Sequence, residues 1–238
     1  MKNKNKIAVF LAARSGSKRL PNKHFLKLNS KITTIDLCIL RLKKIRLVNK
    51  IFLCTTKKSE DDKFENVCNS HGIKLFRGSN NNVAKRIIDC AKENSIETIV
   101  RITADCPLID PSLVDKCVKL HFNNKNDYTS NVLELSFPDG LDVEVFTLKA
   151  LVNSQQSLKS VFNKEHVTHN LQKSISFKKS NFENYKNYSN RRWTLDNLED
   201  YKFLKKVVKY FSPKIYFTWK DLIEAEKYNK CLINIKER

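Results

Sequence analysis

Residues 6–23 read KIAVFLAARSGSKRLPNK. Residues 6–12 are almost entirely apolar and predict a buried β-strand, whereas residues 13–23 are rich in charged and small side chains and predict a loop. Apolar side chains at helical spacing follow over residues 33–47, so a helix is expected there. The stretch therefore opens a strand–loop–helix unit of the kind from which α/β proteins are built.

The same alternation continues through the first half of the chain. Further strands are predicted at residues 50–55, 74–76 and 98–102, and further helices at residues 61–71, at residues 83–94 and from Asp110 onward. Asp110 is suited to cap the last of these helices because Pro111 fits its first turn. Strands that alternate with helices in this way predict a doubly wound α/β fold with a mostly parallel sheet.

The pattern changes after residue 127. Strands are expected at residues 128–133, 141–146 and 192–195, and helices at residues 148–157 and 198–211, whereas residues 174–189 carry no clear pattern. Neither a linker nor an internal repeat divides the sequence. We therefore predict one domain over residues 1–238, with a β-rich excursion in its second half.

The composition is typical of a globular protein. Of the 238 residues, 41% are hydrophobic and 29% are charged, which excludes an intrinsically disordered chain. The longest strongly apolar run, residues 7–13, is far shorter than the roughly 20 residues that a helix needs to cross a bilayer. Arg14 ends this run too early for a typical secretory signal, so no membrane span and a cytoplasmic location are expected.

Charge and cysteine content narrow the possible partners. Basic residues outnumber acidic ones by 45 to 25, a formal net charge of +20 that favours anionic partners. Because the lysines are scattered among asparagines, many of them are also expected simply to form a solvated surface. Seven cysteines without a C-x-x-C pair, and five histidines at no zinc-binding spacing, predict reduced thiols and no zinc site.

The loop at residues 13–23 follows the first strand, at the edge where open parallel sheets bind ligands. Gly16 permits close approach of the backbone, and the guanidinium groups of Arg14 and Arg19 can each grip a phosphate with two hydrogen bonds. The loop contains neither GxxxxGK[ST] nor GxGxxG. Its composition alone also fits a basic surface loop, but its position favours a polyphosphate site. Asp105, just past the strand at residues 98–102, can face the same crevice.

Residues 13–23 closely resemble the ARxGSxRLPxK signature of the sugar nucleotidyltransferases related to the acylneuraminate and 3-deoxy-manno-octulosonate cytidylyltransferases, in particular their SpsF-like branch. Further stretches typical of that branch recur in the same order at residues 76–79, 101–110, 137–145, 165–168 and 194–196. The resemblance covers nearly the whole chain. The sequence departs from the branch at residues 80–85, where acidic residues are usual, and at Asn22, where glycine is usual.

This resemblance implies an enzyme that transfers a nucleoside monophosphate from CTP to a sugar or sugar acid, for surface polysaccharide or glycan synthesis, with release of pyrophosphate and with Mg²⁺ as cofactor. It implies catalytic roles for Arg14, Arg19, Lys23 and Asp105. The nucleotide site would also include Ala13, Ser15, Gly16, Ser17 and Arg77. Mg²⁺ would have two protein ligands, Asp105 and Asp196, although Asp196 also fits a cap for the helix at residues 198–211.

The acceptor is expected to bind in the second half of the chain. Residues 137–145 alternate so that Asp142 and Glu144 share one face of a strand. The resemblance implies that the acceptor sugar is bound by Asp139, Asp142, Glu144 and His166, although an ordinary half-exposed strand fits the same alternation and packing at a subunit contact would also explain His166. It also suggests a homodimer, with residues 128–172 forming both the dimer contact and the sugar site.

Two other functions fit parts of the sequence. A nucleotidyltransferase that uses another nucleoside triphosphate and a phosphorylated acceptor would need the same cationic loop. A basic nucleic-acid-binding protein would explain the charge of +20, but no helix-turn-helix pattern, RNP-like aromatic strand or basic tail accompanies it. Neither a nucleic acid nor a membrane is therefore expected as a partner.

Overall fold

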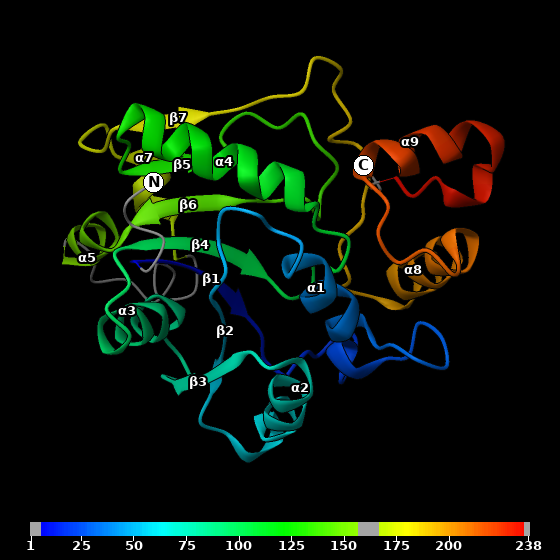
Figure 1. The fold of residues 1–238 in the computed structure, drawn as a ribbon, viewed down its shortest axis with the longest axis horizontal. Coiled ribbons are helices and arrows are strands. Elements are labelled where there is room, and N and C mark those ends of the chain that lie inside the picture. The colour runs from blue at the N-terminus through cyan, green and yellow to red at the C-terminus, as the bar shows by residue number, and fades with distance from the viewer. Residues whose placement is uncertain (1–5, 157–166, 236–238) are drawn as a thin grey trace.

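The computed structural model describes residues 6–156 and 167–235. Their strands form one seven-stranded sheet in the order β3-β2-β1-β4-β6-β5-β7 (Figure 1). In chain order the strands are β1 (Ile7–Ala12), β2 (Ile51–Thr56), β3 (Lys74–Gly78), β4 (Thr98–Thr103), β5 (Tyr128–Ser130), β6 (Glu144–Thr147) and β7 (Lys179–Asn181). Within the sheet, β1 to β4 run parallel, whereas β6 is antiparallel to both β4 and β5. The predicted doubly wound, mostly parallel fold and its change of character in the second half are both confirmed.

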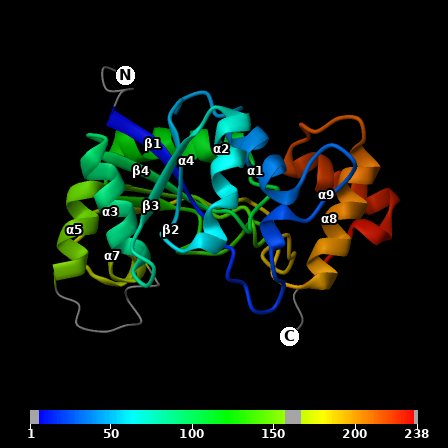
Figure 2. The ribbon, with the colours of Figure 1, turned by 90° about the horizontal axis from the view of Figure 1, so that it is seen from below.

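Helices cover both faces of this sheet (Figure 2). They are α1 (Thr34–Leu42), α2 (Lys63–His71), α3 (Val83–Glu93), α4 (Pro111–Asn124), α5 (Leu148–Gln156), α7 (His169–Lys173), α8 (Leu198–Phe211) and α9 (Trp219–Tyr228), with short 3₁₀ helices at Lys23–Phe25, Ser59–Asp61 and Lys230–Leu232. Apolar residues of α3, α5 and α7 pack on one face, and those of α1, α2 and α4 pack on the other. None of the helices within the described ranges has the length and apolar character that a bilayer crossing requires.

Strand β1 shows why these residues form a central strand. Val9 and Leu11 pack into one core, and Ala8 and Phe10 pack into the other. All four are buried, as the period of two in a strand requires when helices cover both faces of a sheet. The loop that follows β1 is thereby fixed at the carboxyl edge of the sheet, and α8 and α9 lie at the end of the molecule toward which β4 points (Figure 1).

Residues 192–195 do not form the predicted strand. Arg192 makes one isolated bridge with Asp139, and the Trp193 N–H donates to the Asp139 carbonyl oxygen at 2.7 Å. The segment is pinned by close backbone contact, since a Cβ on Gly140 would lie 2.7 Å from the carbonyl carbon of Trp193. Gly140 also has a φ of 106°, which side chains rarely tolerate. Trp193 and Leu195 are buried, but they lie in a packed loop rather than in a β-ladder.

Other boundaries also differ from the sequence prediction. Helix α1 ends at Leu42 rather than at residue 47, and the strand expected at residues 141–146 begins only at Glu144. Strand β7 lies within residues 174–189, where no element was assigned. The prediction of reduced thiols is confirmed, because all seven cysteines are free, and each except Cys231 is buried.

Candidate active site

The loop after β1 lines a cavity of ≈ 600 Å³ at the carboxyl edge of the sheet. Its lining residues are Ala12, Ala13, Arg14, Gly16, Ser17, Lys18, Arg19, Lys23, His24, Val83, Arg86, Arg101, Thr103, Asp105 and Asp196. All the predicted loop residues except Ser15 thus share one cavity with Asp105 and Asp196, which lie far away in the sequence. Most of the ionisable side chains in this lining are cationic, so the cavity suits a polyanionic ligand.

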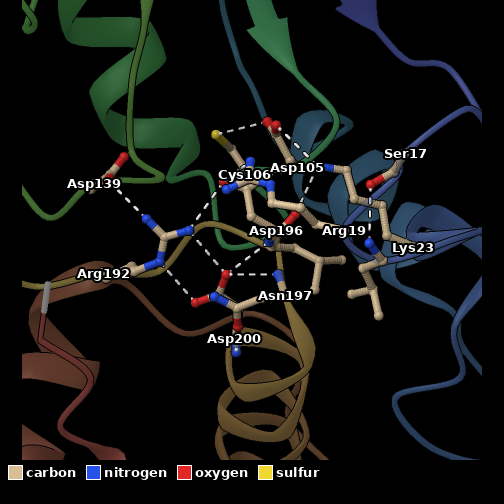
Figure 3. Close-up of polar contacts among 12 residues, drawn as sticks. Ser17, Arg19, Lys23, Asp105, Cys106, Asp139, Arg192, Asp196, Asn197 and Asp200 are labelled. Atoms are coloured by element: carbon tan, nitrogen blue, oxygen red, sulfur yellow. Dashed lines mark hydrogen bonds and ion pairs between the residues drawn. The ribbon is translucent and has the colours of Figure 1, made fainter. Parts of the chain in front are cut away.

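Lys23 joins the two aspartates (Figure 3). Its Nζ lies 3.3 Å from Oδ2 of Asp105 and 3.0 Å from Oδ1 of Asp196, and it donates to the Leu195 carbonyl oxygen at 2.8 Å. The Lys23 side chain is only 10% exposed. Burial raises the pKa of Asp105, but the Lys23 ammonium and a hydrogen bond from Thr103 outweigh it and hold this pKa below its usual value. Asp105 is therefore a carboxylate at neutral pH.

Asp196 is held on its other side by two arginines (Figure 3). Its Oδ2 lies 3.2 Å from Arg19 and 3.1 Å from Arg192. The cap of α8 is Asn197, whose side chain accepts from the Asp200 N–H, so the alternative assignment of Asp196 as the helix cap is wrong. The prediction that Asp110 caps α4 is confirmed, because its Oδ1 accepts from the Ser112 N–H at 2.8 Å.

Asp61 holds the loop after β1, here called the first loop, in place by hydrogen bonds. Its Oδ1 accepts from the Ser15 N–H at 2.7 Å, and its Oδ2 accepts from the Thr56 N–H at 3.2 Å and from the Thr56 hydroxyl. Burial raises the pKa of Asp61, but these hydrogen bonds outweigh it and lower the pKa below its ordinary value. The sequence prediction missed Asp61 because the residue looked like the start of a helix.

Two buried basic residues in the cavity lining were also missed. His24 follows Lys23, and burial, helped by the Lys23 charge, lowers its pKa to about 4. Arg86 is 2% exposed and donates from Nη2 to the Ser79 carbonyl oxygen at 2.7 Å. Neither belongs to a recognisable motif, and only the helical period of residues 83–94 could have indicated that Arg86 faces inward.

A second cavity of ≈ 370 Å³ adjoins the first. It is lined by Arg101, Thr103, Val132, Asp142, Glu144, Val167, Thr168, His169 and Gln172. Asp142 and Glu144 line it together, whereas Val143 and Val145 are buried in the core. Glu144 is itself buried and accepts from the Tyr128 hydroxyl at 2.7 Å, and it pairs with Arg101. Both oxygens of the Glu144 carboxylate are thus bonded to other side chains of the protein.

Three predicted site residues, Arg77, Asp139 and Ser15, line neither cavity. Arg77 lines neither cavity, because its guanidinium pairs with Asp62 and donates to the Thr56 and Lys58 carbonyl oxygens. Asp139 also lines neither cavity, and its Oδ2 lies 3.8 Å from Nη1 of Arg192. His166 lies outside the described residues. Ser15 is buried, and its N–H donates to Asp61.

Asp105 and Asp196 are the residues that could hold a divalent cation. Both carboxylates contact the same Lys23 ammonium, so both face one point of the cavity. In the described residues there is no cluster of three or more His, Cys, Asp or Glu side chains that could hold a metal. The donor set fits Mg²⁺, which commonly takes one or two carboxylates and completes its octahedron with phosphate oxygens and water.

A mostly parallel sheet that presents a cationic loop and paired aspartates at its carboxyl edge defines a nucleotide-binding α/β protein. Comparison with known proteins identifies the group. Residues 8–237 match the cytidylyltransferase family, and the chain belongs to that family. The family resemblance inferred from the sequence is therefore confirmed, and the protein is a nucleotidyltransferase by family.

Three similar proteins show how far the likeness extends. The spore coat polysaccharide biosynthesis protein SpsF of Bacillus subtilis (strain 168) is 30% identical over 211 residues, covering 84% of this chain and 85% of SpsF. A cytidylyltransferase structure from Leptospira borgpetersenii serovar Hardjo-bovis is 33% identical with a TM-score of 0.92, covering 98% of both chains. CMP:2-keto-3-deoxy-manno-octonic acid synthetase, solved with CTP, is 13% identical with a TM-score of 0.66, covering 86% of this chain and 99% of that one. The last shows a common fold.

Proposed function

We propose that the protein transfers CMP from CTP to a hydroxyl group of a sugar or sugar acid and releases pyrophosphate, in the synthesis of a surface polysaccharide or glycan. The observation that carries this proposal is the meeting of the first-loop cations with Asp105 and Asp196 in one cavity. The CTP bound to the synthetase of the same fold, and the name of SpsF, support the choice of nucleotide and pathway class.

The proposed reaction is an in-line substitution at the α-phosphorus. The acceptor oxygen forms a bond to this phosphorus while the bond to the α–β bridging oxygen breaks, pyrophosphate leaves with the electron pair, and the hydroxyl proton passes to solvent. Arg14, Arg19 and Lys23 bind the β- and γ-phosphates and stabilise the departing charge. Gly16 and the loop around it bring backbone N–H groups close to the phosphates.

Mg²⁺ held by Asp105 and Asp196 would neutralise phosphate charge when bound. Before the nucleotide arrives, Lys23 balances both carboxylates, and its move toward the phosphates would free them for the cation. The acceptor occupies the second cavity, where Asp142 can accept hydrogen bonds from its hydroxyl groups. Arg77 and Asp139 are not part of this proposal, because they lie outside both cavities.

The experiment is a screen of the four nucleoside triphosphates against sugars, sugar acids and sugar phosphates, with pyrophosphate release as the readout. We expect release with CTP and an unphosphorylated acceptor, in the presence of Mg²⁺ and not after chelation. Release only with another triphosphate and a phosphorylated acceptor would replace this proposal by the second nucleotidyltransferase hypothesis. Failure of every combination would contradict both.

A further inference from the structure

Arg101 lies where the two cavities meet. Within the described residues, only Arg101 and Thr103 line both cavities. They occupy alternate positions of β4, so both project from the same face of the sheet toward its carboxyl edge. Asp105 follows two residues later and lines the first cavity, which is the proposed nucleotide cavity.

If the proposed function is right, the position of Arg101 between the two cavities determines which part of the nucleotide it contacts. In-line transfer requires the α-phosphorus to lie between the attacking hydroxyl and the leaving pyrophosphate. The hydroxyl belongs to the acceptor in the second cavity, and the pyrophosphate is bound by the loop after β1. The α-phosphate must therefore sit where the cavities adjoin. We propose that Arg101 is a catalytic residue that binds the α-phosphate and stabilises the charge that develops on its oxygens during transfer.

A buried network holds the guanidinium in place. Arg101 Nη1 pairs with Oε2 of Glu144, whose side chain is 6% exposed. The other oxygen of Glu144 accepts from the Tyr128 hydroxyl at 2.7 Å and from Gln172 Nε2 at 3.3 Å. A buried ion pair adds little net stability, so the main effect of this network is to fix the orientation of Arg101.

The guanidinium keeps donors for a ligand. Across residues 6–156 and 167–235, the Arg101 guanidinium bonds only to Glu144, through Nη1, and the side chain stays 20% exposed. Guanidinium–phosphate hydrogen bonds are charge-assisted and often bidentate. The Glu144 carboxylate outweighs the effect of burial and raises the pKa of Arg101, so the group stays charged. A preformed cation at this point needs no reorganisation during transfer.

The test replaces the whole ion pair, so that neither charge is left buried alone. We expect the double variant Arg101→Gln/Glu144→Gln to fold, to bind CTP in the presence of Mg²⁺ within about threefold of the wild-type Kd, and to lose kcat by roughly 100-fold. The matched control is Arg191→Gln/Glu226→Gln, which removes a similarly buried pair at 2.8 Å that lines neither cavity. The control should keep its kcat.

Two further measurements separate catalysis from positioning. Phosphorus NMR of bound CTP should show that the α-phosphorus resonance of the double variant moves toward its free position while the β and γ resonances stay in place. Arg101→Lys keeps a charge opposite Glu144 but loses the planar fork, so it should fold and lose kcat at least about tenfold. It decides the question if the double variant does not fold.

A kcat within threefold of wild type in the double variant, or in Arg101→Lys, would overturn the proposal, as would an unchanged α-phosphorus resonance. The proposed function fails separately. If wild-type protein releases no pyrophosphate from any nucleotide and acceptor, the transfer reaction itself is wrong. An active wild-type protein with an active double variant would refute only the role of Arg101.

Discussion

Asp196 sits among three cations, Lys23, Arg19 and Arg192, and Asp105 shares the first of them. In the proposed reaction these side chains bind the phosphates or a cation, so removing one should affect the rate far more than the fold. We expect Asp105→Asn and Arg19→Ala to lose about 3 kcal/mol of barrier stabilisation, or roughly 100-fold in kcat/KM. Steady-state pyrophosphate release measures this loss.

The control for that pair of variants is Lys202→Ala, which removes an exposed lysine that forms an ion pair with Glu199 on the surface. It should keep full activity. The Arg19 side chain is 70% exposed, so thermal unfolding of Arg19→Ala should match wild type. Retained turnover in either active-site variant, with a normal unfolding temperature, would contradict the roles given to these residues.

Asp61 acts on the same loop without lining the cavity. Its buried carboxylate accepts the Ser15 N–H and two donors of Thr56, and hydrogen bonds to a charged group contribute about 1.5–3 kcal/mol each. Asp61→Asn removes the charge and turns one acceptor into a donor. We expect urea unfolding to show a loss of about 2–3 kcal/mol, together with a weaker affinity for CTP. An unchanged CTP Kd would show that the loop does not depend on Asp61.

At the level of elements, the sequence prediction succeeded where one local pattern determines the structure. Strands β1, β2 and β4 are apolar runs covered on both faces, and a run of this kind has few alternatives. Residues 192–195, also predicted as a strand, form a packed loop that lies in close contact with the backbone of Gly140. Strand β7 is the opposite case, because its polar residues give no strand pattern in the sequence. They form a strand because the edge of β5 is open for backbone pairing.

The candidate site also has residues that a local pattern could predict and residues that it could not. The first loop could be predicted because its cations, Gly16 and its position after a strand lie in one continuous stretch. Its partners Asp61 and Arg86 could not, since what brings them to the loop is the packing of β2, β3 and α3 rather than any local motif. Glu144 was predicted to share a face with Asp142, but its pairing with Arg101 depends on the antiparallel register of β4 and β6.

The contact between α4 and β5 contains a pH-sensitive residue. His121 is 2% exposed beside the Thr129 hydroxyl, and burial lowers its pKa from 6.5 to about 4. Between these two values the unfolded chain binds a proton that the folded chain does not, so stability is complete above pH 6.5 and falls as the pH drops. From pH 7 to pH 5 this histidine should account for about 2 kcal/mol of lost stability.

Urea unfolding at the two pH values tests this expectation. His121→Gln should show a smaller loss of unfolding free energy between pH 7 and pH 5 than wild type, by about 2 kcal/mol. His24 also has a pKa of about 4 and remains in the variant, so part of the acid sensitivity should persist. An identical pH dependence in wild type and variant would mean that folding does not lower the pKa of His121.

At the scale of the whole molecule, the resemblance predicts a homodimer whose contact lies within residues 128–172. The described part of this region supplies β5, β6, α5 and α7, at one end of the sheet (Figure 1). Light scattering should therefore give twice the mass of the chain. A mass of one chain at micromolar concentration would contradict the prediction and leave the active site, as described, within a single chain.

The net charge of +20 should act on substrate capture rather than on the chemical step. CTP is a polyanion and the nucleotide cavity is rich in cations, so the protein attracts it over distances comparable to the Debye length. That length shrinks from about 14 Å at 0.05 M salt to about 4 Å at 0.5 M. We expect kcat/KM for CTP to fall roughly tenfold over this range while kcat changes little, because bound phosphates are screened far less.

Inhibition by cytidine, which carries no charge, is the control and should be insensitive to salt. If kcat falls in parallel with kcat/KM, salt is disrupting the site itself, and the scattered lysines contribute solvation rather than attraction.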